Sequence, residues 1–434
     1  MARPNHETMR VRRIAWTIAL PFAMACLAAI LLGPTGDVTS EAFDQNQHHL
    51  LVIRSFAGQW PSPDLRDYQS ATAPLWHLIQ SIPASVGMPL EGLRAISTLA
   101  GVLLIMLVAR VSARLASRAE LAWLALPAAI NPYTLSGSIW ITTDVPATLA
   151  LTLALALALL DRRGRGMFLA IGTAIRQSGV WMLPSIALVT WFGAPAGSST
   201  PTRARRTLVA IMPALVVLCT LVWIWGGLTP PSYRDQHDRG MNLATPAFTL
   251  ALVALWGLPL LTIRGLREVR RVPVPVMAST VALGAFIALA VPTSYDMDAG
   301  RWGGPLWGIV QRAPAIADRS LVLLVLAPLG AATLLLLVKR AHESMRGGAG
   351  VALGLGMIGL IAANTANSQC WERYADLPVM VLLVWLSSLG VRGRCAEDRR
   401  ALLIGAALLA VVQGVLSAWL VVTPLVRGAG PLGA

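Results

Sequence analysis

The chain has 434 residues, of which 56% are hydrophobic and 13% are charged, and its formal net charge is +14. This composition excludes an ordinary soluble domain and is typical of a protein with many membrane spans. The positive charge comes from arginines scattered over short connections, with Lys339 as the only lysine, which indicates membrane topology rather than nucleic-acid binding.

The first predicted span covers residues 13–33 and follows the basic segment MRVRR. Its apolar stretch is longer than that of a cleaved signal peptide, which favours an uncleaved anchor. A polar segment, residues 34–94, follows and holds Asp37, Glu41, Asp44, Asp64, Asp67 and three histidines. Because the rest of the chain is so apolar, we expect this segment to lie where water and chemistry meet.

The remaining chain, residues 95–434, is predicted to be a helical bundle. Its apolar runs are each long enough to cross a hydrocarbon core of roughly 30 Å, and they lack the alternation of barrel strands. They cover residues 95–112, 120–136, 142–160, 167–193, 207–226, 245–263, 274–291, 320–338, 350–366, 377–392 and 401–422. The sequence therefore predicts an all-α polytopic membrane protein of about 12–13 transmembrane helices, in a single domain over residues 1–434.

The placement of arginine predicts the orientation of the spans. Arginine-rich connections should lie in the cytoplasm, yet two of them, 161–165 and 202–206, flank the single run 167–193. A hairpin of two short helices that turns at Gln177 satisfies both connections, whereas one tilted span violates the rule at one end. With the hairpin, the outer segments are 34–94, 137–141, 227–244, 292–319 and 367–376.

The first candidate site lies in the polar segment. Asp44 and His48 are four residues apart and would share one helix face, with Glu41 one turn before Asp44. A partly buried carboxylate beside an imidazole can act as a general base. The spacing equally fits an interfacial amphipathic helix whose polar face meets water, and it does not decide between Glu41 and Asp44 as the base.

A second set consists of arginines in or beside outer segments, at Arg176 (followed by Gln177), Arg301 and Arg373. The planar guanidinium binds two phosphate oxygens at once and stays charged. The alternative for each is a snorkelling side chain or an ion pair with Glu372, Asp296 or Asp298. Asp144, just inside the lipid boundary, is by default a functional or pairing residue.

Aromatic residues also gather in the outer segments and include Trp60, Tyr68, Trp76, Trp302, Trp307, Trp371 and Tyr374. They serve either as belt anchors or as stacking surfaces for sugars. The sequence has no Walker loop, GxGxxG, GxSxG or HExxH motif, so a soluble nucleotide donor is unsupported and no cofactor or metal is predicted. A donor for an outward-facing site would have to come from the lipid.

The order of these motifs resembles the GT-C superfamily of integral membrane glycosyltransferases, and within it the α-1,2-glucosyltransferases of dolichol-linked oligosaccharide assembly. Asp44, His48 and Arg54 stand at the places of the family's Asp-Glu-x-x-x-His signature and following Arg, with Gln45 where the family has Glu. Further similar stretches are Gln59-Trp60, Thr72 to Trp76, Arg176-Gln177, Asp298 to Trp302 and Arg373-Tyr374.

The resemblance implies an inverting, metal-independent transfer of sugar from a polyprenyl-phosphate donor to a glycan or glycolipid acceptor. Asp44 would be the base, oriented by His48 and Glu41, and the leaving phosphate would be held by Arg176, Gln177, Arg301 and Arg373. The remaining predicted substrate-binding residues are Arg54, Trp60, Asp67, Tyr68, Thr72, Asp144, Trp302 and Tyr374.

Two other classes stay open. A polytopic transporter or flippase for a lipid-linked or anionic substrate would place charges on broken helices near the midplane, whereas here they concentrate in outer loops. A glycan polymerase or ligase would have its largest outer loop late in the chain, whereas here it is the first. The short loops and near-absence of lysine indicate a bacterial inner-membrane protein, with the N-terminus cytoplasmic and the site periplasmic.

Overall fold

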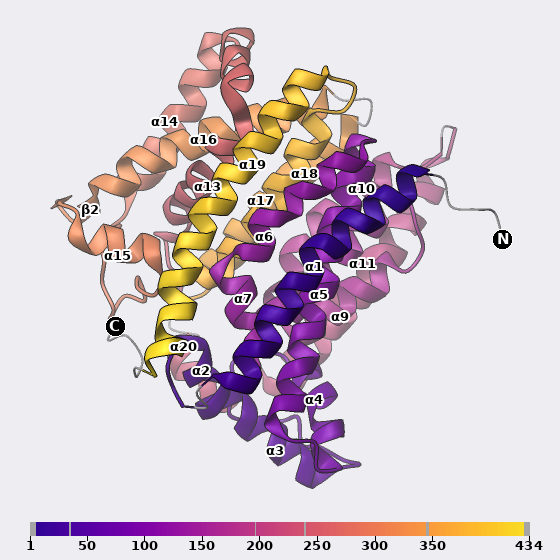
Figure 1. Cartoon of the computed structure of the whole chain (residues 1–434), viewed down its shortest axis with the longest axis vertical. Helices are drawn as coiled ribbons and strands as arrows, with labels where there is room; N and C mark the ends of the chain where they lie inside the picture. The colour runs from indigo at the N-terminus through magenta and orange to yellow at the C-terminus, as the bar shows by residue number, and fades with distance from the viewer. Residues whose placement is uncertain (1–5, 34–35, 196, 238–239, 344–346, 429–434) are drawn as a thin grey trace. The chain divides into compact units, whose positions relative to one another are not determined.

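The computed structural model describes residues 6–33, 36–195, 197–237, 240–343 and 347–428. It is helical apart from one two-stranded hairpin (Figure 1). The chain divides into two compact units. Unit 1 comprises residues 1–16, 108–128 and 240–412, and unit 2 comprises residues 17–107, 129–239 and 413–434. The helices with residues in both units are α1 (His6–Leu32), α5 (Leu90–Ala116), α6 (Leu126–Ile130) and α19 (Ala396–Ser417).

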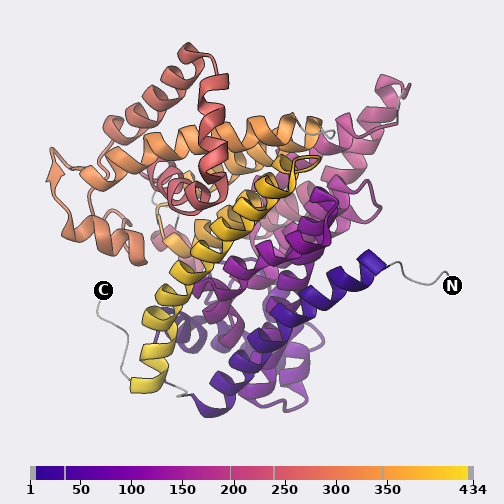
Figure 2. The ribbon, with the colours of Figure 1, turned by 45° about the horizontal axis from the view of Figure 1, so that its top comes forward.

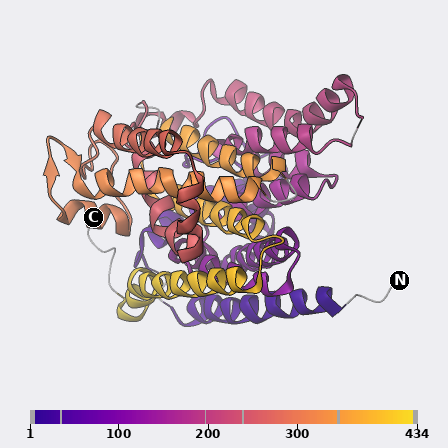
Figure 3. The same ribbon diagram turned by 90° about the horizontal axis from the view of Figure 1, so that it is seen from above.

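Unit 1 is built around the contact of two long apolar helices, α13 (Thr245–Arg267) and α16 (Leu321–His342). Its other elements are η2 (Ala119–Ala125), η5 (Glu268–Arg271), α14 (Val274–Ala290), α15 (Pro305–Arg312), β1 (Ala315–Ile316), β2 (Arg319–Ser320), α17 (Gly347–Thr365) and α18 (Glu372–Gly390). Strands β1 and β2 pair antiparallel, with Ala315 opposite Ser320. Figures 2 and 3 show α14 beside α16, with this hairpin at the end of the pair.

Unit 2 holds the polar segment and most of the short helices. Its elements are α2 (Ser40–Asp44), η1 (Gln45–His49), α3 (Leu50–Gln59), α4 (Leu75–Ser85), α7 (Pro132–Ile139), α8 (Asp144–Leu159), α9 (Arg165–Ile175), η3 (Gln177–Met182), α10 (Leu183–Phe192), α11 (Thr200–Trp225), η4 (Pro231–Tyr233), α12 (Arg234–His237), η6 (Ala418–Val422) and α20 (Thr423–Arg427). Helix α3 packs against α4, and α8 and α11 both pack against α9.

The predicted reversal within residues 167–193 is present in unit 2. Asp161, just before α9, forms an ion pair with Arg206 near the start of α11, at 2.6 Å. Gln177, at the turn of the hairpin, donates to the carbonyl of Leu228, which lies beyond the opposite end of α11. Helix α10 ends at Phe192, and residues 193–199 connect it to the start of α11. The basic connections on both sides of the hairpin therefore lead to the same end of α11.

Among the described residues, six helices are long and apolar enough to cross a membrane, and a seventh crossing follows if α7 and α8, bent by 114°, form one span. The six are His6–Leu32, Leu90–Ala116, Thr200–Trp225, Leu321–His342, Gly348–Thr365 and Ala396–Arg427. The all-α, multi-span fold is confirmed, and the chain is a multi-pass integral membrane protein.

Several predicted spans are shorter helices in the structure. The predicted run 120–136 ends at Ile130, because Asn131 caps the next helix by accepting from Tyr133 N and Thr134 N, and Pro132 follows. The described helices of 10–17 apolar residues are Ala119–Ile130, Arg165–Ile175, Thr245–Leu261 and Val274–Ala290. Where a helix breaks, the backbone groups that it frees need other hydrogen-bond partners. At this break, Ser417 Oγ is such a partner and donates to Ile130 O.

Candidate functional site

The first part of the polar segment folds as one helical run from Ser40 to Gln59, and this run contains a π-helical turn. Thr39 caps its start by accepting from Ala42 N at 3.1 Å. Asp44 is the last residue of α2, and His48 lies within the π turn η1. Such turns occur frequently at functional sites, because they redirect the side chains on either side. The sequence predicted Asp44 and His48 on one regular α-helix, whereas the structure has a π turn between them.

His48 is held by a tyrosine from a distant part of unit 2. A hydrogen bond of 2.5 Å joins Tyr233 Oη and His48 Nδ1, and the two rings meet edge to face at 5.7 Å. Burial and, second, the Asp44 carboxylate raise the pKa of the Tyr233 hydroxyl above its ordinary value. Tyr233 thus stays protonated at neutral pH and lies close enough to Asp44 to feel its charge, so these three side chains form one polar group.

Asp67 positions the short turn that carries Tyr233. Its carboxylate accepts from both Ser232 N, at 3.0 Å, and Ser232 Oγ, at 2.6 Å. Two hydrogen bonds to one carboxylate fix the orientation of η4 as well as its position. The predicted substrate-binding residue Asp67 therefore acts on the site through Ser232 and Tyr233.

Glu41, the other predicted base, is more buried than Asp44. Its side chain is 8% exposed, and its Oε2 accepts from Ser40 Oγ at 3.0 Å. Asp44 is half-buried and has an electrostatic influence on Tyr233. These contacts favour Asp44 as the more accessible carboxylate.

Arg176 and Asp144, predicted separately, form an ion pair in unit 2. Arg176 ends α9 and Asp144 begins α8, and their side chains are 16% and 19% exposed. Arg176 is therefore in an ion pair, with Asp144 and not with one of the three acids named as alternatives, and a partly exposed guanidinium can still offer its remaining N–H groups to an anion.

Gln177, beside Arg176, has an amide that is bonded to three backbone groups. Its Nε2 donates to Ala71 O, at 2.7 Å, and to Leu228 O, at 3.0 Å, and its Oε1 accepts from Ala73 N at 3.0 Å. Both of its N–H groups are thus used within the protein. The structure places Gln177 as a clamp between the segment 71–73 and Leu228, and the predicted contact with donor phosphate finds no support in this geometry.

The predicted substrate residues of the polar segment differ in their surroundings. Tyr68 is buried, 7% exposed, and packs against Phe56 and Trp225 while its hydroxyl donates to Thr72 O at 2.7 Å. A ring in this apolar cluster contributes to the core and does not offer a stacking face to a sugar. Arg54 is exposed, and Trp60 is 39% exposed with its indole N–H donated to Ser81.

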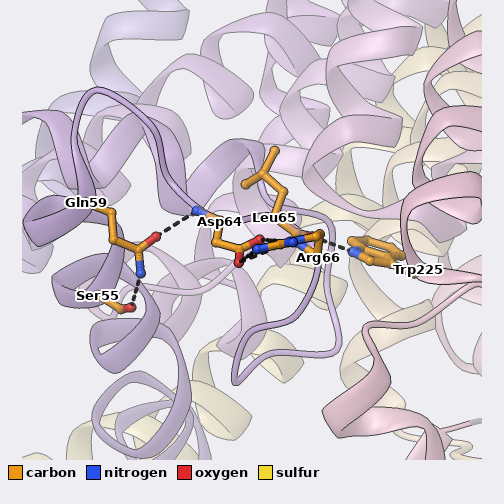
Figure 4. A network of polar contacts seen from close by, with 6 residues as sticks. All are labelled: Ser55, Gln59, Asp64, Leu65, Arg66 and Trp225. Atoms are coloured by element: carbon orange, nitrogen blue, oxygen red, sulfur yellow. Dashed lines mark hydrogen bonds and ion pairs between the residues drawn. The ribbon is translucent and has the colours of Figure 1, made fainter.

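A polar network fixes the loop between α3 and α4 (Figure 4). Gln59 at the end of α3 accepts from Asp64 N at 2.7 Å and donates to Ser55, and Trp225 on α11 donates to Leu65 O at 2.9 Å. Asp64 also pairs with Arg66 at 2.7 Å, which lowers the pKa of the Asp64 carboxyl to about 2. The loop before Asp67 is therefore held at both sides.

Unit 1 holds the second predicted cluster. The segments 296–303 and 368–374 meet through Cys370 N, which donates to Gly300 O at 2.8 Å, and through Asn242, whose amide donates to Ala299 O and Ser368 O. Trp302 meets Trp371 edge to face at 5.2 Å. The structure thus brings the two predicted arginine-aromatic motifs together.

The two arginines of this cluster have different surroundings. Arg301 donates to Ser294 O at 2.7 Å and pairs with Asp296 at 3.0 Å, as the ion-pair alternative predicts. Arg373 lies over the Trp371 ring at 4.7 Å and the Tyr374 ring at 5.3 Å. Glu372, its proposed partner, instead accepts from Leu306 N at 2.8 Å. A guanidinium that lies over two rings is held in place by cation–π contacts.

Within the described ranges, no cluster of three or more His, Cys, Asp or Glu side chains has the arrangement of a metal site. No protein-family model and no curated protein sequence matches the chain. Solved structures give a different result, because similarity in fold extends further than similarity in sequence.

The fold is similar to that of ArnT from Cupriavidus metallidurans bound to undecaprenyl phosphate, with a TM-score of 0.50 and 13% identity over 92% of this chain and 63% of that chain. The fold is GT-C-like. The Archaeoglobus fulgidus oligosaccharyltransferase, tethered with an acceptor peptide, gives a TM-score of 0.46 and 13% identity over 94% of this chain and 55% of that one. This chain thus spans less than two thirds of the length of either protein. The similarity to α-1,2-glucosyltransferases stays a prediction.

Tyr233 is the residue of the site that the sequence did not indicate. It lies 185 residues from His48, so no local spacing relates the two. Its only signal in the sequence is its position within the predicted outer segment 227–244.

Proposed function

We propose that the chain is a membrane glycosyltransferase that transfers a sugar from a polyprenyl-phosphate donor to a glycan or glycolipid acceptor on the non-cytoplasmic side. The observation that carries this proposal is the group formed by Asp44, His48 and Tyr233, in a chain whose fold is similar to that of ArnT bound to undecaprenyl phosphate.

In the proposed reaction, an acceptor hydroxyl attacks the anomeric carbon of the donor sugar. The bond between that carbon and the phosphate oxygen breaks, and the polyprenyl phosphate leaves with the bonding electrons. Asp44 takes the proton of the attacking hydroxyl, because its carboxylate is half-buried yet reachable at the start of the π turn. Attack from the side opposite the phosphate inverts the anomeric configuration.

His48 and Tyr233 orient the acceptor and the base. The bond from Tyr233 to Nδ1 fixes the imidazole plane, so that its other nitrogen is presented at a defined angle. Asp67 supports this arrangement by holding Ser232. The base and its orienting residues are thus fixed before substrate binds, which reduces the reorganisation needed in the transition state.

Arginine supplies positive charge for the leaving phosphate. Arg176, paired with Asp144 in the same unit as Asp44, is the proposed phosphate contact. In unit 1, Arg301 holds the loop 294–301 through Ser294 and Asp296, and Arg373 lies over the Trp371 and Tyr374 rings. Fixed charges directed at a developing anion are commonly the largest single contribution to catalysis.

The assignment of the base is tested by comparing Asp44→Asn with Glu41→Gln, each purified in detergent and supplied with the donor that the wild type uses. We expect Asp44→Asn to lower the turnover number by at least about 1,000-fold, and Glu41→Gln by about tenfold or less. If Glu41→Gln is the inactive variant and Asp44→Asn turns over, Glu41 is the base.

A further inference from the structure

Behind Asp44, a buried arginine and a buried glutamine hold the π turn. Gln45, the first residue of η1, is completely buried. Its Oε1 accepts from Arg94 Nε at 2.9 Å and from Ile141 N at 3.2 Å. One side-chain oxygen thus connects the π turn to α5 and to the break between α7 and α8, three residues before Asp144.

The network continues away from Arg94 along the surface of the turn. Gln45 Nε2 donates to Asn46 Oδ1 at 2.8 Å, and Asn46 Nδ2 donates to Asp37 Oδ1 at 2.6 Å. The turn is therefore bonded from its buried side by Arg94 and from its wetter side by Asp37. Because a π turn is less favourable than an α-helix of the same sequence, such bonds are what maintain it.

Arg94 is unusual because, among the described residues, it is buried without an ion pair to an acid, and Glu91 acts on its charge only through the electrostatic field. Arg94 is 0% exposed and lies over the Trp140 ring at 4.2 Å, and its Nη2 has no hydrogen-bond partner among the described residues. A buried arginine without a paired carboxylate costs stability. The acceptor that Arg94 does have is the neutral side chain of Gln45. Stability alone does not explain why a buried arginine is paired with a neutral acceptor.

From this geometry we propose that Arg94 and Gln45 are positioning residues for Asp44, which hold the π turn so that Asp44 and His48 face Tyr233. This inference rests on the proposed function, because its readout is the rate of sugar transfer. The residues act through the backbone of the turn and do not touch substrate. Loss of the Gln45 acceptor should therefore lower kcat while leaving KM for donor and acceptor nearly unchanged.

The test uses two variants that disrupt this arrangement. Gln45→Met removes the acceptor for both Arg94 and Ile141 but leaves the arginine charge buried, which can impair folding. The double variant Gln45→Met/Arg94→Met also removes that charge, and replacing both partners by apolar groups of similar size is nearly neutral for stability. We expect both to lower kcat about 100-fold, the scale of a 1 Å displacement of a catalytic group.

Two further variants serve as the rescue and the control. Gln45→Glu keeps the oxygen that accepts from Arg94 and Ile141, adds a charge for Arg94 and loses only the donor to Asn46, so kcat should stay within about threefold of the wild type. Gln80→Met is the matched control, because Gln80 is another fully buried glutamine whose hydrogen bonds among the described residues go to α5, at Leu93 O and Ser97 Oγ, and not to the turn. Its kcat should also stay within about threefold of the wild type, since it leaves the turn intact.

Several outcomes would overturn the inference. These are wild-type kcat in the double variant, an equal loss of kcat in Gln80→Met, or a loss in Gln45→Glu as large as in Gln45→Met. If the wild type turns over a polyprenyl-phosphate sugar and any one of these three outcomes is seen, the proposed function stands and only the positioning role is refuted. A wild type that transfers no sugar from such donors overturns both.

Discussion

Tyr233→Phe tests the link between the first polar segment and the η4 turn. The substitution removes one hydroxyl and its 2.5 Å hydrogen bond to His48, while the edge-to-face ring contact at 5.7 Å is kept. A hydrogen bond of this kind contributes about 0.5–1.5 kcal/mol net. If its full value is used to orient His48 in the transition state, kcat should fall about 2- to 12-fold.

The assay is the initial rate of polyprenyl-phosphate release by purified protein in detergent, at saturating donor and acceptor. Tyr68→Phe is the matched control, because Tyr68 also loses one hydroxyl bond, to Thr72 O at 2.7 Å, but from within the core of the same unit. We expect Tyr68→Phe to lower the free energy of unfolding by about 1 kcal/mol without changing kcat.

Two results would refute this reasoning. If Tyr233→Phe keeps kcat within measurement error of the wild type, the bond to His48 does not orient the site. If Tyr68→Phe lowers kcat as much as Tyr233→Phe, the effect comes from general loosening of unit 2 rather than from the contact with His48.

Three other predictions concern the surroundings of this site. Arg176→Ala should raise KM for the donor about 10- to 100-fold and leave KM for the acceptor unchanged; an unchanged donor KM would leave Arg176 only its ion pair with Asp144. Gln177→Leu should lower the free energy of unfolding by about 1–3 kcal/mol in thermal unfolding, because two loops lose their clamp, and an unchanged melting temperature would contradict that. Burial, with His49 second, lowers the pKa of His77 well below its ordinary value, so the folded protein keeps His77 neutral. Stability is then complete above pH ~6.5 and falls by up to about 1.4 kcal/mol per pH unit below it, and His77→Gln should flatten this acid limb.

The sequence predicted the fold class because apolar length and arginine placement are properties of single segments. It also predicted the hairpin within residues 167–193, since two basic connections cannot lie on one side of a membrane after a single crossing. The sequence predicted too long a helix around Asn131. The apolar composition is continuous there, but Asn131 caps a new helix that begins with Pro132, so the preceding helix ends at Ile130.

The site was only partly predictable for a similar reason. Asp44 and His48 lie four residues apart, so one local pattern indicates both as candidates, whereas Tyr233 meets His48 only through tertiary structure. Tyr68 and Gln177 were chosen by residue type and position in a loop, and the structure uses them for packing and for clamping. Residue type cannot distinguish a side chain that faces substrate from one whose hydrogen bonds are already made within the protein.

The account depends on transfer from a lipid-phosphate donor with Asp44 as base. The most direct measurement supplies purified wild type and Asp44→Asn with a panel of polyprenyl-phosphate sugars and a mixed glycolipid acceptor fraction, and follows free polyprenyl phosphate. The account predicts release by the wild type from at least one donor, dependent on acceptor, and at least about 1,000-fold slower release by the correctly inserted variant. Equal release by both proteins, or release from none of the donors, would contradict it.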